Sequence, residues 1–151
     1  MYYFSSNSCD SCPVGKMNPS YGGNDSSNCT SCKPGSYQNL VGSASCTLCP
    51  SGTYNTLVGS ISIDSCLSCS IGTFNPSQGG NDSTNCSSCI AGTYQSLVGQ
   101  SSCVLCPAGT YNPNTGSSSP SSCTSCPAGT YNPSLGSPAL SSCINCSTGT
   151  Y

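Results

Sequence analysis

The hydrophobic residues of this chain do not recur at the i, i+3 and i+4 spacing of a helix in any window, and Gly or Pro interrupts every stretch. The string Gly-Thr-Tyr-Asn recurs instead, followed by Leu-Val-Gly or Asn-Pro-Ser-x-Gly. The first string is β-prone, and the others favour turns whose Gly can adopt positive φ. The pattern therefore predicts short β-hairpins and almost no helix.

The same pattern is an internal repeat. All 16 Cys fall in eight C-x-x-C pairs, 17 or 20 residues apart, which begin at residues 9, 29, 46, 66, 86, 103, 123 and 143. A Gly follows the second Cys of every pair by three residues, and an aromatic residue stands two positions later in seven units. The exception is the first unit, which has Met17 there. The length difference lies in the spacer before the next Cys, which has six residues in long units and three in short ones.

A longer period of 57 residues joins three units into a block. Residues 22–29 and 79–86 are closer copies of each other than neighbouring units are, as are residues 37–42 and 94–99. We interpret residues 1–151 as a single array of eight repeats in which triplets were duplicated. The chain ends inside its eighth unit, so we expect it to be a fragment of a longer secreted repeat protein.

The composition is too poor in aliphatic residues for a packed core. Leu, Ile, Val and Phe make up 20 of the 151 residues, below the ~20% expected of a chain that folds around a core. Sixteen Cys exceed the ~8–10% typical of a disulfide scaffold. The expected fold is small and disulfide-rich, mostly irregular with short β-hairpins, and an elongated linear array in which each unit contacts its neighbours.

Charged residues are also scarce, which excludes several functions. The chain has two Lys, four Asp and no His, Arg or Glu. Two Lys cannot supply the basic footprint of a nucleic-acid-binding protein. Without His, and without two carboxylates close in sequence, we expect no enzyme activity. No apolar run reaches the ~18–20 residues that span a bilayer, so we expect no membrane insertion in this segment.

The C-x-x-C pairs are open to three interpretations. Tandem pairs at this spacing match a zinc site of four thiolates, and a single tuned pair would suggest thioredoxin-like redox chemistry. The secreted-type composition, the lack of helices and the lack of basic residues favour structural disulfides without a metal cofactor. Loops of about 15 residues closed by a bridge each contribute roughly 3 kcal/mol in the chain-entropy model.

Two bridge patterns suit the repeat. In one, alternate cysteines cross-link neighbouring units, as Cys9 with Cys29 and Cys12 with Cys32. In the favoured one, the second Cys of each pair joins the first Cys of the next, because this pattern tolerates a spacer of either length. It leaves Cys9 and Cys146 to pair outside the segment, and it predicts the bridges Cys12–Cys29, Cys32–Cys46, Cys49–Cys66, Cys69–Cys86, Cys89–Cys103, Cys106–Cys123 and Cys126–Cys143.

Three further patterns concern the surface. Five N-x-[S/T] sequons predict covalent N-glycans, at Asn24, Asn28, Asn81, Asn85 and Asn145. The aromatic series suggests rings that cover the disulfides and supply most of each unit's buried area, or alternatively a ladder that stacks on sugars. Asp25 and Asp82 raise the question of calcium, but one carboxylate per loop is too few for the 6–8 oxygen ligands required.

A resemblance to a known family is carried by one string and its copies, Cys106-Pro107-Ala108-Gly109-Thr110-Tyr111 … Gly116 … Cys123-Thr124-Ser125-Cys126. It resembles the ephrin-receptor-like cysteine-rich repeat, which is similar to tumour-necrosis-factor-receptor modules and to the wider growth-factor-receptor-like class. Tandem copies this uniform look most like surface proteins of ciliates and other protists. The resemblance implies an elongated β rod, laddered by disulfides, outside the cell.

These observations together favour an extracellular or cell-surface structural glycoprotein. We expect the segment to form an elongated rod within a filament, fibril or surface coat. Its expected partners are other copies of itself, bound end-to-end or laterally, and a carbohydrate is a further candidate. The alternative is a receptor or adhesin ectodomain that binds a protein or carbohydrate partner.

Overall fold

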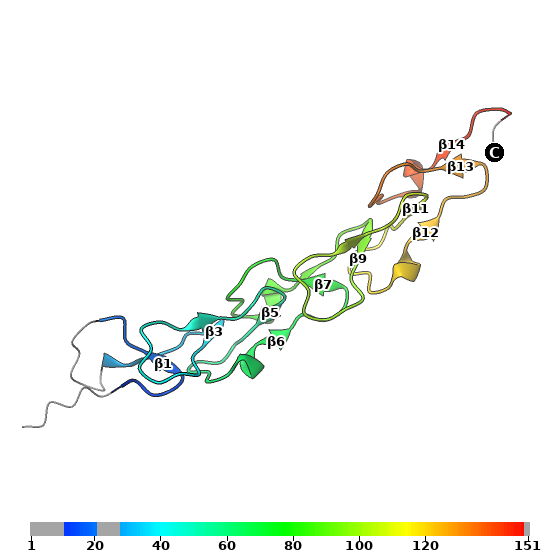
Figure 1. Cartoon of the computed structure of the whole chain (residues 1–151). Coiled ribbons are helices and arrows are strands. Elements are labelled where there is room, and N and C mark those ends of the chain that lie inside the picture. Colours follow the sequence, from blue (N-terminus) through cyan, green and yellow to red (C-terminus); the bar gives the residue numbers. More distant parts are fainter. Residues whose placement is uncertain (1–10, 21–27, 150–151) are drawn as a thin grey trace, which may run out of the picture.

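The chain is a long, thin rod (Figure 1). A computed structural model describes residues 11–20 and 28–149. Within these ranges the regular structure consists of two-residue strands and single 3₁₀ turns, with the rest in turns and irregular backbone. The expected fold is therefore confirmed: a small, disulfide-rich, elongated array of short hairpins.

Every hairpin is a two-stranded antiparallel sheet that is local in sequence. The first strand begins one residue after the Gly that follows the second Cys of a pair, and the second strand occupies the two residues inside the next pair. The seven hairpins of the described residues are β1 (Lys16–Met17) with β2 (Thr30–Ser31), β3 (Ser36–Tyr37) with β4 (Thr47–Leu48), β5 (Thr53–Tyr54) with β6 (Leu67–Ser68), β7 (Thr73–Phe74) with β8 (Ser87–Ser88), β9 (Thr93–Tyr94) with β10 (Val104–Leu105), β11 (Thr110–Tyr111) with β12 (Thr124–Ser125), and β13 (Thr130–Tyr131) with β14 (Ile144–Asn145).

Four of the long units contain a single 3₁₀ turn that the short units lack, and most of the spacer of the first long unit lies outside the described residues. These turns are η2 (Ile63–Ser65), η3 (Ser83–Asn85), η4 (Pro120–Ser122) and η5 (Leu140–Ser142), and each stands directly before the first Cys of a pair. The side chains of Ser62, Asp82 and Ser119 cap the first three by accepting a backbone N–H bond, as N-cap residues do. The three extra residues of a long spacer thus form one 3₁₀ turn, and that of η5, which follows Ala139, has no side-chain cap.

Neighbouring units are joined by backbone hydrogen bonds that repeat at every described junction. Between the units of β5 and β7, the Gly52 amide donates to the Asn75 carbonyl at 2.7 Å, and the Gly79 amide donates to the Cys49 carbonyl at 2.8 Å. The Asn55 amide donates to the Gly80 carbonyl at 2.9 Å. The same three bonds recur at the other five junctions, so one backbone ladder runs along the rod.

A unit also touches the unit two places along. Gly52 has a φ of +83°, and a Cβ added there would run into the carbonyl oxygen of Gly99. Gly35 approaches Gly79 in the same way. Only Gly combines this φ with so close an approach of two backbones. The expectation that each unit contacts only its immediate neighbours was therefore incomplete.

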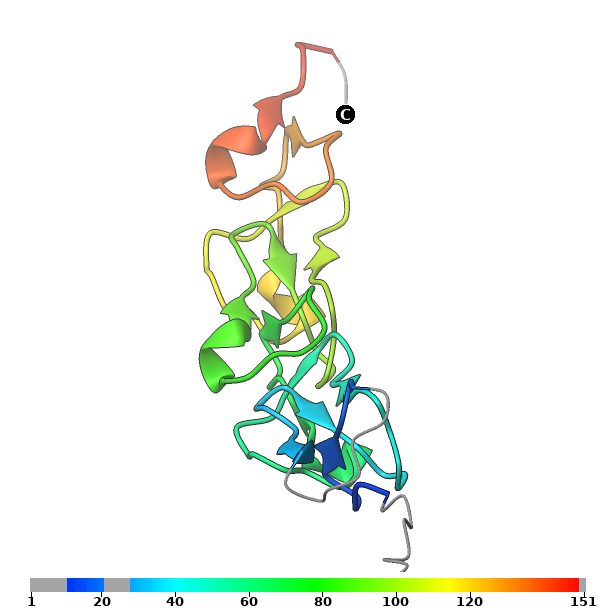
Figure 2. The ribbon, with the colours of Figure 1, turned by 90° about the vertical axis from the view of Figure 1, so that its left-hand side faces the viewer.

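Corresponding parts of units that are three places apart in the chain lie on the same side of the rod. The turns η2 and η4 both lie along the lower edge of the rod in Figure 1, where they are green and gold. The turns η3 and η5 both project to the left in Figure 2, where they are green and orange. By the same period, the two short units, those of β3 and β9, share the third side. The 57-residue sequence period is thus also the interval after which units return to the same side of the rod.

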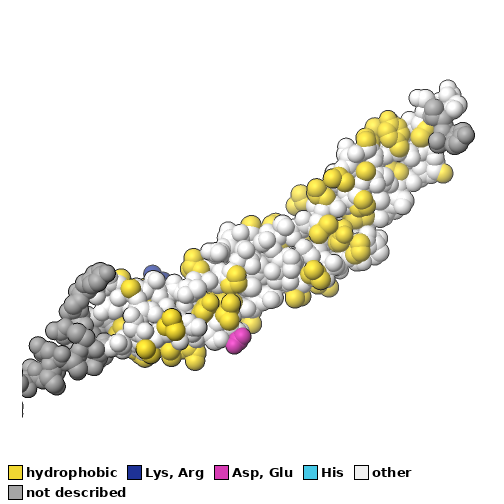
Figure 3. Space-filling model, in the orientation of Figure 1, with side chains coloured by type: hydrophobic (Ala, Val, Ile, Leu, Met, Phe, Trp, Pro, Cys, Tyr) yellow, Lys and Arg dark blue, Asp and Glu magenta, His cyan; other side chains and the backbone are white. Residues whose placement is uncertain are grey.

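The interior holds sulfur and amides rather than aliphatic side chains. Cys32, Cys49, Cys89 and Cys106 have exposed fractions of 0%, and their neighbours in the interior are mostly Asn, Gln and Ser. Aliphatic side chains instead form separate patches along the surface (Figure 3). The described aromatic rings are half-buried, except that of Tyr131, which is 50% exposed, and the interpretation that they supply most of the buried area stays a prediction.

Candidate functional site

One disulfide closes each unit along the described chain. The second Cys of every pair from Cys12 onward lies bonded to the first Cys of the next pair, with Cα atoms 5.5 to 5.8 Å apart. The bonds are the seven of the favoured pattern, from Cys12–Cys29 to Cys126–Cys143. Sequence separations of 17 and 14 residues give the same Cα spacing, because the extra turn of a long unit lies outside the hairpin.

The favoured bridge pattern leaves one cysteine at each end of the array without a partner in the segment. Cys146 is a free, half-buried thiol. Its amide donates to the Gly129 carbonyl at 2.9 Å, which is the bond that the second Cys of the other pairs makes. Cys9 lies outside the described residues. Cys146 therefore stands in the same backbone setting as the bridged cysteines that precede it.

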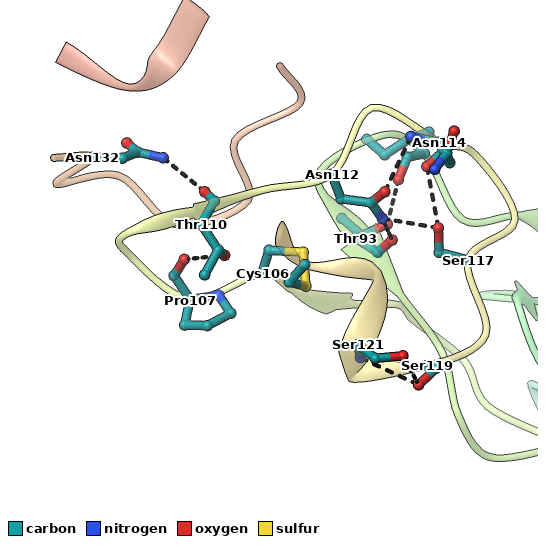
Figure 4. The surroundings of a disulfide bond; sticks show 12 residues. Thr93, Cys106, Pro107, Thr110, Asn112, Asn114, Ser117, Ser119, Ser121 and Asn132 are labelled. Carbon is teal, nitrogen blue, oxygen red and sulfur yellow. Dashed lines mark hydrogen bonds between the residues drawn. A yellow bond between two sulfur atoms is a disulfide. The ribbon is translucent and has the colours of Figure 1, made fainter. Parts of the chain in front are cut away.

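In each long unit after the first, a buried Asn donates a hydrogen bond to the preceding unit (Figure 4). The Nδ2 of Asn112 donates to the Thr93 carbonyl of the preceding unit at 3.0 Å and to the Ser117 Oγ at 2.9 Å. Its Oδ1 accepts from the Asn114 amide at 3.1 Å, and the side chain is fully buried. Asn55 makes the same three contacts, and Asn75 and Asn132 share the bond to the preceding unit and the bond within the turn.

The short units replace this Asn by Gln. The Nε2 of Gln38 donates to the Ser45 carbonyl at 2.7 Å, and the equivalent Nε2 of Gln95 donates to the Ser102 carbonyl at 2.8 Å. Both carbonyls stand directly before the first Cys of the next pair, within the same unit. The longer side chain therefore bridges a three-residue spacer, whereas the Asn of a long unit reaches back across the junction.

This amide position was missed in the sequence, although a signal was present. Gln follows the aromatic residue in both 17-residue units, and Asn follows it or its Met17 counterpart in the long units that precede another pair. Sequence reasoning assigned the Asn to a turn, because Asn-Pro strings favour turns. The correlation of Gln with short units and Asn with long units would have indicated a side chain whose contacts depend on the length of the spacer.

The sequons lie on the surface where the structure describes them. Asn28, Asn81, Asn85 and Asn145 are exposed, and Asn24 lies outside the described residues. The Oδ1 of Asn85 accepts from the Asn81 and Asp82 amides at 2.8 and 3.0 Å, which leaves its Nδ2 available for a glycan. All four described positions thus offer room for attachment.

The Asp82 carboxylate stabilises a local turn. The Thr84 backbone amide donates to Asp82 at 2.9 Å, and this bond, with a second from the Thr84 side chain, holds the pKa of Asp82 below its ordinary value of 3.8. Asp25 lies outside the described residues. Within the described ranges no three His, Cys, Asp or Glu side chains gather where they could hold a metal ion.

Comparison with known families identifies the repeat. The family model for tyrosine-protein kinase ephrin type A/B receptor-like repeats matches residues 19–66 and 79–123, more than half of the chain. The chain belongs to this ephrin-receptor-like family of cysteine-rich repeats. A search of curated proteins gave no significant match. Such disulfide-rich, receptor-like repeats are typically non-enzymatic and indicate an extracellular domain. None of the helices in the described part is long and apolar enough to cross a membrane.

Proposed function

We propose that this chain is a segment of an extracellular structural glycoprotein, a rod within a filament, fibril or surface coat. The observation that supports this best is the backbone ladder, which repeats the same three bonds at all six described junctions. Such regular stacking carries the same geometry along the whole array, so the shape extends with each added unit. The segment acts through its shape, without enzyme activity, nucleic-acid binding or insertion into a membrane.

The partners of this rod are other copies of it, bound end-to-end or laterally. A chain with two Lys and four Asp has little electrostatic repulsion to keep copies apart. Heterologous contacts that do not close produce open fibres. The rod carries covalent N-glycans at its sequons and no other cofactor, and the glycans hydrate a surface that has few charges.

Microscopy of native material tests the proposal. Negative staining of the protein from its source should show filaments or a layer of rods, and a non-reducing gel should show Cys9 and Cys146 bonded to residues outside this segment. Isolated short monomers, with Cys9 and Cys146 bridged within one chain, would contradict it.

A second candidate is a receptor or adhesin ectodomain, which the family match favours. A shallow depression beside Lys33, lined also by Met17, Ser45 and Leu48, is the kind of feature that a specific partner would use. Saturable 1:1 binding of a protein or carbohydrate to monomeric rods, lost on Lys33→Ala, would favour this candidate over a structural role.

A further inference from the structure

We propose that the exposed Leu-Val dipeptides of the two short units form the surface through which two copies of this rod associate side by side. These dipeptides, Leu40–Val41 and Leu97–Val98, are called the tip pair below. The proposal rests on the lateral association put forward above and adds the surface responsible for it.

The tip pair is unusually apolar and exposed for its position in a turn. Leu40 and Val41 are 64% and 67% exposed, and Leu97 and Val98 are 62% and 58% exposed. Turns in soluble proteins are normally polar, and exposed apolar groups that recur in register mark interaction sites more often than scattered ones do. The recurrence of the exposed Leu-Val dipeptide in both short units therefore favours an interaction site.

Each tip is held in a fixed conformation by a buried side chain. The amides of Leu40 and Leu97 each donate to the Oε1 of the Gln two residues before, both at 3.0 Å. Gln38 and Gln95 are buried, and their Nε2 groups are bonded to the spacer. A tip that is already ordered loses little conformational entropy when it docks.

The two tips lie 57 residues and three units apart, so the period seen for the 3₁₀ turns places them on the same side of the rod. Leu57–Val58 has the same sequence and similar exposure, 61% and 67%, but belongs to a unit on another side. Its counterpart 57 residues on is Asn114–Thr115, so that side carries no recurring apolar tip.

The side with the tip pair is also separate from the side with the paired sequons. Asn81 precedes the turn η3 and Asn85 is its last residue, and the unit of η3 shares its side with that of η5. Glycans there would project away from the tip pair. The rod can therefore be hydrated on one side and associate through another.

A second copy of the chain is the occupant that the surface fits. A buried aliphatic side chain removes on the order of 100 Å² from water, so four partly exposed ones contribute roughly 250 Å² from each rod. That is well short of the ~800 Å² per partner of a stable interface. Only a partner with apolar groups at the same three-unit spacing engages both tips at once, and this chain has that spacing. The contact is weak for two triplets and strengthens with each added triplet.

Methyl NMR of the oxidised protein at increasing concentration tests the proposal, with Leu57 and Val58 as an internal control. We expect the methyl signals of the tip pair to shift as the protein approaches about 1 mM, where a contact of this size associates. The signals of Leu57 and Val58 should not move. The variant L97S/V98S should raise the dissociation constant about tenfold, and the matched variant L57S/V58S should change it less than twofold.

The outcomes separate the two proposals. If the wild-type rod stays monomeric throughout, both lateral association and the role of the tip pair are wrong. If it associates while the two variants weaken association equally or not at all, lateral association stands and the tip pair is not its surface. Amide spectra of each variant matching the wild type away from the substitution show that the array remains folded.

Discussion

The close approach of Gly52 to Gly99 offers the sharpest test of how units stack. Replacing Gly52 by Ala adds a methyl group in the path of the Gly99 carbonyl, two units along the rod. The same change at Gly109 adds a methyl group that meets nothing within 4 Å, although the φ of Gly109, +80°, is close to the +83° of Gly52. Both variants therefore carry the energetic cost of a side chain at positive φ, and only Gly52→Ala adds a steric clash with the Gly99 carbonyl.

The structure sets the size of each effect. A side chain at positive φ costs about 1–2 kcal/mol, and this cost applies to both variants. Overpacking costs a further 1–3 kcal/mol or so, and it applies only to Gly52→Ala. Because about 1.4 kcal/mol corresponds to a factor of ten, the extra term corresponds to roughly a 5- to 150-fold larger opening equilibrium.

Native-state hydrogen exchange with the disulfides intact measures this opening locally. In Gly52→Ala the amide of Gly99, which donates to the Cys69 carbonyl at 2.8 Å, should exchange faster than in the wild type by the combined factor. In Gly109→Ala the amide of Gly136, which donates to the Cys106 carbonyl at 2.8 Å across the junction with the next unit, should show only the smaller φ effect. Equal acceleration in the two variants would refute the second-neighbour contact.

Three further predictions concern the amides, a cap and the glycans. Asn112→Ala removes three buried hydrogen bonds and should destabilise its junction by about 2–4 kcal/mol in hydrogen exchange, whereas exposed Asn114→Ala should change it by less than about 0.5 kcal/mol. Because the folded state lowers the pKa of Asp82, the capping contribution is present above its ordinary value of 3.8 and is lost as the pH falls through the lowered pKa. In acid the amide of Thr84, which Asp82 caps, should exchange faster relative to the amide of Ser121, which Ser119 caps without a titratable group. Parallel acid profiles of the two amides, after correction for intrinsic exchange, would contradict this. Peptide mapping of native material should find a glycan on at least one sequon of the η3 unit, and an unmodified pair would count against a glycoprotein.

The fold class could be predicted from the sequence because the repeat constrains it strongly. Gly and Pro in every unit exclude long helices, and few aliphatic residues exclude a common core. Cysteines at two fixed spacings then predict local cross-links and an elongated array. These are properties of spacing and composition, and they do not require knowledge of any side-chain contact.

The interior could not be predicted in the same way. Asn112 and Gln95 stand in strings that favour turns, and sequence reasoning assigned their neighbours Tyr111 and Tyr94 to the interior. In the rod the aromatic rings are only partly buried and the amides are enclosed. The reason is that backbone carbonyls need hydrogen-bond partners in the interior, and a buried amide supplies one, across the junction in the long units and within the unit in the short ones. The contact between second neighbours was missed because it depends on the rotation between units.

Small-angle scattering of the oxidised, unassociated protein tests the central claim, which is that disulfide-closed units stack into a rod. At concentrations below the association threshold, the account predicts a radius of gyration well above the compact value and a pair-distance distribution with the long tail of a rod. A radius near 15 Å or so, the value of a compact domain of this length, would contradict it.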